Sequence, residues 1–271
     1  MSRKIVLENF PPGVSLPAPW KTYVKGDASL VARGNTLHFV NTNMVSTRYT
    51  DAQIDDYQGL ARRHFLWRPP LQMRVRARFS HPAGALQGTA GFGFWNDPFL
   101  MTGLRWPALP RVIWFFYSSA PSNMKLDLQT PGHGWKAATL DATRWPFLAL
   151  LPTAPIAVPL MNVGPIYRAC WPLGQKTIQV SEAMLPVDMT EWHTYLIDWQ
   201  TNSAQFMVDG QTILDCQTSP RGPLGFVMWL DNQYMVITPW GNFNYGLLDA
   251  PGQQWMELDR LEIRDRVGDL A

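Results

Sequence analysis

The chain has 271 residues and a formal net charge of +2, and 46% of its residues are hydrophobic. This apolar content and low net charge exclude a disordered chain. The 23 basic residues are scattered along the sequence and nearly matched by 21 acidic ones, which argues against a nucleic-acid-binding surface.

The N-terminal ten residues have no apolar stretch followed by a small-residue cleavage site. We therefore read no signal peptide and expect a cytoplasmic protein. Cys170 and Cys216 could pair in an oxidising compartment, but in the cytoplasm we expect reduced thiols. CxxC, HExxH, GxSxG and Walker patterns are absent, so no motif requires a cofactor.

Most of the chain reads as short strands. The clearest is Leu71–Phe79, where apolar residues alternate with Gln and Arg as in a half-buried antiparallel strand. Asp209-Gly210 predicts a tight hairpin, because both turn positions need positive φ. Further strands are predicted at residues 29–33, 36–41, 88–96, 111–118, 124–130, 193–199, 203–208, 211–216, 223–231 and 254–264. So many strands predict an all-β sandwich, which we treat as one domain over residues 1–271.

Residues 137–186 interrupt this pattern, and we expect them to form an insertion of one or two short helices and irregular loops. Within it, the 23 residues from Trp145 to Tyr167 carry no charge and match the length of a membrane-crossing helix. Prolines at 146, 152, 155, 159 and 165 argue against such a helix. A segment this apolar does not stay exposed to water, so we expect another surface or molecule to cover it. It could pack on its own sandwich, cover a cleft as a lid, contact a hydrophobic ligand or membrane surface, or join two copies in a homo-oligomer.

Two neighbouring segments carry a family resemblance. Residues 192–199 read WHTYLIDW, and residues 206–210 read FMVDG. They resemble a hairpin of the concanavalin A-like lectin/glucanase superfamily, and most closely its laminarinase-like members of glycoside hydrolase family 16. Residues 255–263 resemble that family's closing strand and Leu7–Phe10 its opening strand. The resemblance implies a jelly-roll sandwich of two antiparallel sheets, with ligands laid across the concave face of one of them.

Hydrolases of that family carry an E-x-D-x-x-E strand across the cleft, and retaining hydrolysis needs two carboxyl groups about 5–5.5 Å apart. At the corresponding place, after Gly91–Trp95, this chain has the strand Arg111–Ser118, whose residues are mostly apolar and aromatic. We therefore expect the E-x-D-x-x-E pattern to be missing and the protein not to be a standard retaining glycosidase.

The end of the strand at 88–96 offers a first group of ligand-binding candidates. Trp95, Asn96 and Asp97 could stack on a ligand and hydrogen-bond to it. The same residues could instead form an Asx turn before Pro98.

The end of the strand at 223–231 offers a second group. Period two places Trp229, Asp231 and Gln233 on one face, with Asn232 beside them, where an aromatic ring and polar groups could grip a polyol. A plain surface loop is the other reading. If the protein is an enzyme and Asp97 converges with Asp231, these two are its acid/base candidates.

Further candidates come from aromatic and acidic residues elsewhere. Trp114 and Tyr117 could extend the stacking surface, as could Trp240 with Asn242, although alternating aromatics also suit a sandwich core. Some members of the family hold a structural calcium ion, and Glu8 and Asp259 stand in similar places. Two surface carboxylates are the plainer reading of that pair.

These observations leave three hypotheses for function. The leading one is ligand binding in the concave cleft, with a carbohydrate as the default ligand. The second is a non-hydrolytic enzyme or binder that acts on an apolar small molecule under a lid formed by residues 145–167. The third is a structural or oligomerisation module.

Overall fold

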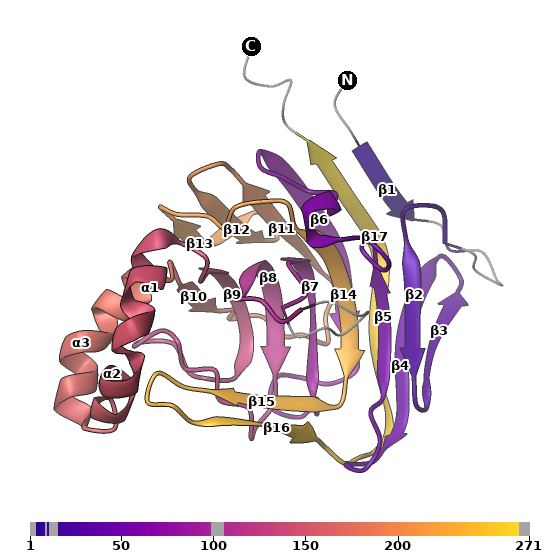
Figure 1. Ribbon diagram of the computed structural model, residues 1–271. Helices are drawn as coiled ribbons and strands as arrows, with labels where there is room; N and C mark the ends of the chain where they lie inside the picture. Colours follow the sequence, from indigo (N-terminus) through magenta and orange to yellow (C-terminus); the bar gives the residue numbers. More distant parts are fainter. Residues whose placement is uncertain (1–3, 9, 11–15, 99–105, 266–271) are drawn as a thin grey trace.

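The computed structural model describes residues 4–8, 10, 16–98 and 106–265 (Figure 1). Within them the chain forms two large antiparallel sheets that pack on a shared hydrophobic core. The predicted β-sandwich is therefore confirmed. Asn9, part of the predicted opening strand, lies outside the described residues.

The larger sheet has eight strands. Seven of them are hydrogen-bonded in the order β13 (Gln211–Cys216), β12 (Ala204–Val208), β11 (His193–Trp199), β6 (Leu71–Phe79), β17 (Ala250–Asp265), β4 (Thr36–Met44) and β3 (Ala28–Arg33). The eighth, β1 (Lys4–Glu8), pairs with β17. The strand β17, which the resemblance identifies as the family's closing strand, thus lies inside this sheet between β6 and β4.

The smaller sheet has seven strands. Their order is β10 (Ser181–Met184), β9 (Gly134–Asp141), β8 (Arg111–Ser118), β7 (Thr89–Trp95), β14 (Gly225–Asp231), β5 (Asp51–Asp55) and β2 (Lys21–Lys25). A separate hairpin, β15 (Gln233–Ile237) with β16 (Phe243–Leu247), follows β14 directly. A short 3-10 helix spans Arg62–His64.

The alternation in β6 has the predicted effect. Its apolar residues from Leu71 to Phe79 have no exposed surface, whereas Arg74 and Arg76 are exposed to solvent. The hairpin between β12 and β13 turns at Asp209 and Gly210, with φ of 50° and 81°. The turn prediction is confirmed.

Aromatic rings fill the space between the sheets. Trp67, Trp135 and Trp199 are almost fully buried there. The ring of Phe92 lies 5.9 Å from that of Trp135 and 5.2 Å from that of Tyr195. Each such ring removes about 150–250 Å² from water, so many of the tryptophans contribute to the stability of the fold.

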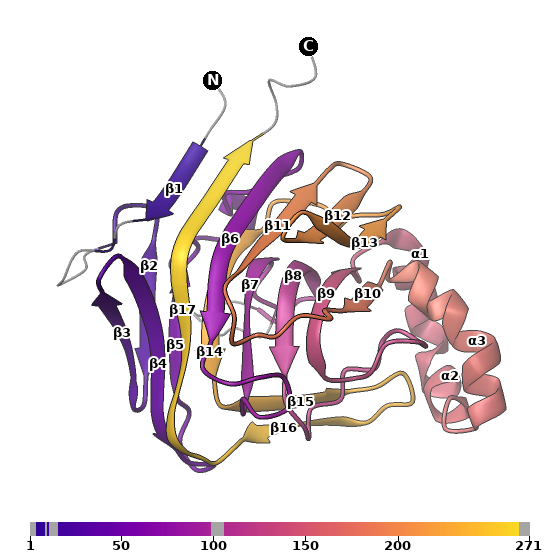
Figure 2. The same ribbon diagram turned by 180° about the vertical axis from the view of Figure 1, so that it is seen from behind.

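The insertion is narrower and more helical than predicted. Strand β9 extends into the predicted range and β10 lies within it. The helices between them are α1 (Trp145–Leu150), a 3-10 helix (Leu151–Thr153), α2 (Ala154–Leu160) and α3 (Gly164–Thr177). We call residues 145–177 the helical insertion. It projects beyond the β10 edge of the smaller sheet (Figures 1 and 2). Small residues such as Ala137 and Ala138 hide the alternation of β9, which is why the sequence did not reveal this strand.

The strand predicted at residues 124–130 is wrong. This segment turns instead, because the Asp127 carboxylate accepts hydrogen bonds from the backbone N–H groups of Gln129 at 2.7 Å and Thr130 at 2.9 Å. In the described part of the chain, no helix has the length and apolar character needed to cross a membrane.

Candidate functional site

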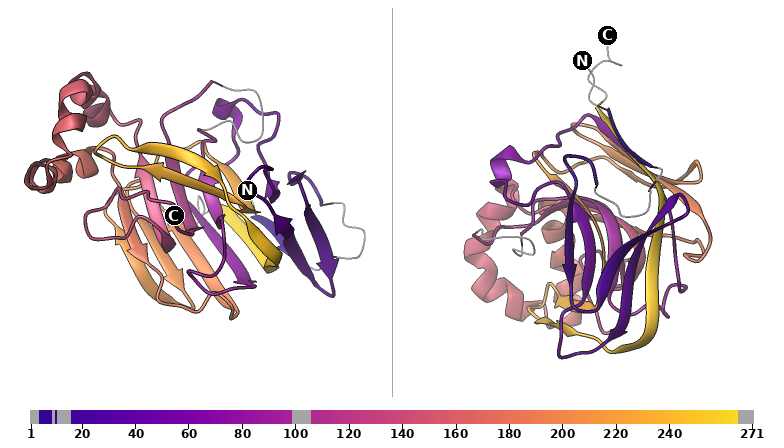
Figure 3. Two further views of the ribbon diagram at one scale, coloured as in Figure 1. Left: turned by 90° about the horizontal axis from the view of Figure 1, so that it is seen from below. Right: turned by 90° about the vertical axis from the view of Figure 1, so that its right-hand side faces the viewer.

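A cleft of about 630 Å³ lies on the outer face of the smaller sheet, the face turned away from the core. Strands β9, β8, β7 and β14 form its floor. Its walls are the helical insertion, which contributes Phe147, Ala157 and Trp171, and the β15–β16 hairpin. Figure 3 (left) shows this hairpin running across the sheet toward the helices. Most of the lining side chains are aliphatic or aromatic.

Four rings form what we call the aromatic floor: Trp95, Trp114, Phe116 and Trp229. The rings of Trp114 and Phe116 stack at 5.1 Å, and the ring of Trp114 lies 5.4 Å from that of Trp229. The ring planes of Trp95 and Trp229 differ by only 9°, and the ring centres are 6.5 Å apart. The structure thus places Trp95, Trp114 and Trp229, all predicted ligand contacts, in the cleft.

A glycine of β7 makes room for this floor. A Cβ atom at Gly91 would lie 2.4 Å from the carbonyl oxygen of Phe115 and 3.1 Å from Cη2 of Trp229. Such distances are below van der Waals contact, so any larger residue would displace β8 or the Trp229 ring. The bare backbone of β7 is therefore what lets rings from the strands on both sides meet above it.

Two carboxylates, Asp51 and Asp231, stand at one end of the cleft, and we call them the acid pair. They are directly opposed in the β5–β14 ladder and are 1% and 3% exposed. Asp231 lines the cleft, and its Oδ1 accepts hydrogen bonds from Thr89 Oγ1 at 2.7 Å and Gln233 N at 3.0 Å. The Tyr49 hydroxyl donates to Asp51 Oδ2 at 3.0 Å.

Burial changes the protonation of this pair. It raises the pKa of Asp231 to about 6, despite the hydrogen bonds from Thr89 and Gln233 that oppose the shift. Burial also raises the pKa of Asp51 well above its ordinary value, and the charge of Asp231 raises it further. Two buried carboxyl groups this close do not both ionise readily, so near neutral pH the pair holds a proton that it can donate.

A second polar group in the cleft is already paired. Lys136 is 1% exposed, and its Nζ lies 3.2 Å from the carboxylate of Glu182 and 3.1 Å from the carbonyl oxygen of Pro131. Burial raises the pKa of Glu182, and the charge of Lys136 opposes this shift. The ion pair links β9 to β10 and presents little unsatisfied charge to a ligand.

Three predicted ligand contacts have structural roles instead. Tyr117 faces the core, and its hydroxyl donates to the carbonyl oxygen of Leu86 at 2.8 Å. Asn96 accepts from the backbone of Arg111 at 2.9 Å and is 1% exposed. Asn232 is fully buried and its amide bonds to surrounding backbone, including Thr50 N at 2.9 Å. None of the three is available to a ligand in the cleft.

The predicted acid/base candidates Asp97 and Asp231 do not converge. Asp231 pairs with Thr89 at one end of β7, whereas Asp97 follows Trp95 at the other end. The six steps from Thr89 to Trp95 separate these ends by about 20 Å. Asp97 is fully buried in a turn, and its carbonyl oxygen accepts a hydrogen bond from Arg62 at 2.6 Å. The carboxylate partner of Asp231 is Asp51.

The remaining predicted contacts belong to the hairpin. Gln233 lines the cleft beside Asp231. Trp240 lies at the hairpin tip, where its ring is 5.2 Å from that of Tyr167 and its carbonyl oxygen accepts from Asn162 at 3.1 Å. Asn242 is exposed at the same tip. Trp240 thus attaches the hairpin to the helical insertion.

The E-x-D-x-x-E spacing does occur in the chain, at Glu257, Asp259 and Glu262, so the expectation that it is missing is wrong. These residues lie on β17 of the larger sheet, outside the cleft. Glu257 pairs with Arg78 at 2.7 Å and Asp259 with Arg76 at 2.6 Å. On the cleft floor itself, β8 carries aromatic rings, as the sequence predicts.

The calcium ion expected at Glu8 and Asp259 stays a prediction. Glu8 contacts Arg260 at 2.8 Å, and Asp259 contacts Arg76. Arginine thus neutralises both carboxylates. Within residues 4–8, 10, 16–98 and 106–265, no three His, Cys, Asp or Glu side chains gather in a metal-binding arrangement.

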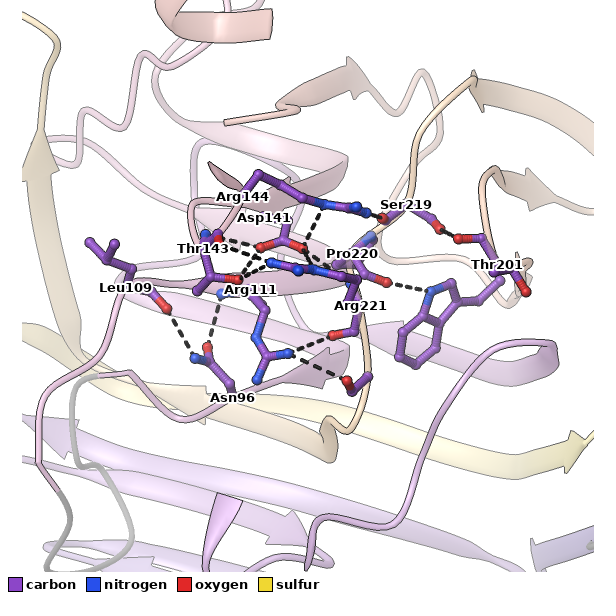
Figure 4. Close-up of polar contacts among 12 residues, drawn as sticks. Asn96, Leu109, Arg111, Asp141, Thr143, Arg144, Thr201, Ser219, Pro220 and Arg221 are labelled. Carbon is purple, nitrogen blue, oxygen red and sulfur yellow. Dashed lines mark hydrogen bonds and ion pairs between the residues drawn. The ribbon is translucent and has the colours of Figure 1, made fainter. Parts of the chain in front are cut away.

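A polar network fixes the start of the helical insertion (Figure 4). Buried Asp141, at the end of β9, accepts from Thr143 Oγ1 at 2.6 Å and lies 3.0 Å from Arg144 Nε and 3.2 Å from Arg221 Nε. Burial by itself would raise the pKa of Asp141, but hydrogen bonds from Thr143 and Arg221 outweigh it, and the pKa is lowered. Arg144 also donates to the carbonyl oxygen of Ser219 at 2.8 Å, which ties the insertion to the loop before β14.

Sequence reasoning missed Asp51, Gln53 and Tyr49. The segment Asp51–Asp55 does alternate polar residues with Ala and Ile, which is a strand pattern with one polar face. Because acidic residues and Ala are poor strand formers, the segment was not predicted as a strand. That alternation was the signal that could have revealed β5 and its place beside Asp231.

Comparison with known proteins supports the fold. A scan against protein-family models gives no match, and neither does a search of curated proteins. Among solved structures, a GlcNAcα1-4Gal-releasing endo-β-galactosidase from Clostridium perfringens is 13% identical with a TM-score of 0.55, covering 98% of this chain and 62% of that one. The chain thus spans less than two thirds of that neighbour's length.

A second neighbour is described as an immunostimulatory antigen and pseudo β-1,3-glucanase of Mycobacterium tuberculosis. It is 13% identical with a TM-score of 0.51, and the match covers 96% of this chain and 97% of that one. A laminarinase from Flavobacterium matches with a TM-score of 0.47 at 14% identity over 95% and 98% of the two chains. The two neighbours with TM-scores above 0.5 show that the chain has the concanavalin A-like lectin/glucanase fold, as predicted.

Proposed function

We propose that the protein binds an apolar small molecule in the cleft, with a polar group of that molecule at the acid pair. The observation that carries this proposal is the lining: rings and aliphatic side chains cover the floor and the insertion wall of a cleft of about 630 Å³. Clefts of this size with a few convergent polar groups are typical of sites for small organic ligands.

The polar side chains in the cleft already bond to one another. This supports an apolar ligand rather than a carbohydrate, which is the leading hypothesis from the sequence. A sugar presents many hydroxyl groups, each of which needs a hydrogen-bond partner once it leaves water. In the cleft, Lys136 and Glu182 already bond to each other, and Thr89 bonds to Asp231. Few groups remain to replace the water around a glycan.

The packing of the aromatic floor points the same way. Trp95, Phe116 and Trp229 are only 7–8% exposed, because the rings cover one another. A carbohydrate platform offers a broad open ring face, whereas this floor offers a continuous hydrocarbon surface with little exposed area per ring. We therefore place the hydrocarbon skeleton of the ligand over the floor.

The acid pair defines the second requirement on the ligand. A protonated carboxyl group at Asp231 can donate to a ligand carbonyl or hydroxyl, and an ionised one can accept from a hydroxyl or bind an amine. Gln233 lies beside it and adds an amide. The ligand class is thus a ring or branched hydrocarbon skeleton with one polar end.

Fluorescence titration with N-phenyl-1-naphthylamine, an apolar amine, tests the proposal. Ala157→Trp places a large ring in the cleft from the α2 wall, and we expect it to weaken probe binding at least tenfold. Ala169→Trp is the matched control, because Ala169 lies on exposed α3 surface outside the cleft lining, and it should leave affinity unchanged. The proposal fails if Ala157→Trp binds the probe as the parent does, or if laminari-oligosaccharides bind and displace it.

Thiol alkylation provides an independent readout. Cys170 is exposed and lines the cleft, whereas Cys216 is buried and its burial raises the pKa of that thiol to about 12. Alkylation with iodoacetamide should therefore modify Cys170 alone, and saturating probe should slow that modification. An unchanged rate with bound probe would place the probe outside the cleft.

A further inference from the structure

The helical insertion exposes large apolar side chains that do not line the cleft. Trp145 of α1 is 75% exposed, Ile156 of α2 is 72% exposed, and Leu160 and Val163 are 46% and 48% exposed. Single exposed apolar residues are ordinary, but here they gather on one projecting module (Figures 1 and 2). So many exposed apolar side chains on one module, which we call the apolar patch, favour a surface that meets something other than water.

The charges of this module have one sign. Residues 142–181 contain no Asp or Glu, and their basic residues are Arg144, Arg168 and Lys176. Arg168 and Lys176 are exposed on α3. Short helices that combine exposed Trp and aliphatic residues with basic residues are suited to the interface of an anionic lipid bilayer.

The same charge pattern argues against a second copy of the chain as the partner. A twofold contact would set the patch against itself, and would bring Arg168 and Lys176 toward the same residues of the other copy. The module holds no acidic residue that could offset this repulsion. An anionic lipid surface, by contrast, complements both the charge and the apolar side chains.

From this exposure and charge pattern we infer that the helical insertion binds the surface of an anionic lipid bilayer without crossing it. Trp145 and Ile156 enter the interfacial region, while Arg168 and Lys176 meet the headgroups. Proline interruptions keep the helices short, so the module lies along the surface. The inference is independent of the ligand proposed for the cleft.

Vesicle co-sedimentation of the full chain tests this inference. We expect binding to phosphatidylcholine vesicles that contain phosphatidylglycerol, weaker binding to pure phosphatidylcholine, and loss of binding as salt is raised. Trp145→Ser with Ile156→Ser should reduce partitioning about tenfold or more, because two large apolar side chains no longer leave water. Arg168→Gln and Lys176→Gln should each reduce it about fivefold, which corresponds to about 1 kcal/mol per basic residue.

A matched control uses exposed apolar residues elsewhere. Val24 and Val45 are 41% and 39% exposed and lie outside the module, so Val24→Ser with Val45→Ser should leave vesicle binding unchanged. Circular dichroism verifies that every variant is folded. The cleft variant Ala157→Trp should also bind vesicles as the parent does, which separates this test from that of the cleft.

Three results would overturn the inference. The first is no binding to the anionic vesicles. The second is binding that Trp145→Ser with Ile156→Ser leaves unchanged. The third is a dimer, seen by light scattering, that this double variant dissociates while vesicle binding stays absent; the patch would then be a contact between copies of the chain.

Discussion

Asp51 of β5 and Asp231 of β14 face each other across an antiparallel strand pair at the end of an apolar cleft. Directly opposed residues in such a pair have Cβ atoms about 4.5–5.5 Å apart. Burial and mutual repulsion raise the pKa of Asp51, and burial raises that of Asp231. The two groups therefore titrate as a pair rather than as separate carboxylates.

Because burial raises the pKa of Asp231, we predict that the free energy of unfolding falls as the pH rises toward neutrality. The pKa of Asp231 is about 6 in the folded protein, against about 3.9 for an unfolded Asp. The stability that comes from the protonated form is full below about pH 4 and is lost as the pH rises through about 6. Asp231→Asn removes this titration and keeps an oxygen acceptor for Thr89 and Gln233.

We expect Asp231→Asn to unfold at a higher temperature than the parent at pH 8 and to show little or no gain at pH 4. Thermal unfolding followed by circular dichroism at these two pH values measures the difference. Asp259→Asn, on the outer face of the larger sheet, is the control for loss of one negative charge. An equal gain at both pH values would show that the acid pair does not titrate as described.

Phe116 and Tyr117 are neighbours on β8 but face opposite sides of the sheet, the first toward the cleft and the second toward the core. Substituting each one therefore tests the cleft and the core separately. Phe116→Ala removes a ring of the aromatic floor, so it should weaken N-phenyl-1-naphthylamine binding about tenfold and cost about 3 kcal/mol of stability. Tyr117→Phe removes the hydroxyl that bonds to Leu86 O and Gly84 N. It should cost about 1 kcal/mol and leave probe binding unchanged. Urea unfolding and probe titration of both variants check this, and weaker binding in Tyr117→Phe would contradict it.

The close approach at Gly91 predicts a strong effect of one methyl group. In Gly91→Ala, the new Cβ would lie 2.4 Å from Phe115 O, which belongs to the neighbouring strand. We expect a loss of about 2 kcal/mol and weaker probe binding, because Trp229 must also move. Gly164→Ala is the control, since its Cβ would meet only the Arg168 side chain at 3.8 Å. A Gly91→Ala protein as stable as the parent in urea would refute the packing argument.

The sandwich could be predicted because the sequence features that indicate its strands and turns are local. The alternation of β6 and the Asp209-Gly210 turn each depend on residues close together in the chain. The sequence did not predict the face of each β8 residue, because the apolar run through residues 112–117 lacks alternation: Phe116 lines the cleft and Tyr117 the core.

Only the part of the candidate site that depends on local sequence could be predicted. Period two correctly joined Trp229 and Asp231 on one face. The partner of Asp231 depends on the pairing of β5 with β14, two strands far apart in the sequence, and nothing local specifies that pairing. Asp97, chosen because it ends a neighbouring strand, lies at the opposite end because β7 and β14 are antiparallel.

The network at Asp141 predicts acid sensitivity at the base of the helical insertion. Because the pKa of Asp141 is lowered in the folded protein, the contribution of this carboxylate to stability is present above about pH 4 and is lost as the pH falls through the folded pKa.

Asp141→Asn leaves Arg144 and Arg221 without their carboxylate, and we expect it to cost about 2–3 kcal/mol at pH 7. At an acidic pH below the folded pKa of Asp141, the parent carboxylate is itself protonated, so the gap between parent and variant should shrink. Urea unfolding at both pH values measures that gap, and hydrogen exchange at pH 7 should show faster exchange in α1, since Arg144 precedes it. A gap of the same size at both pH values would mean that the charge of Asp141 does not hold the insertion in place.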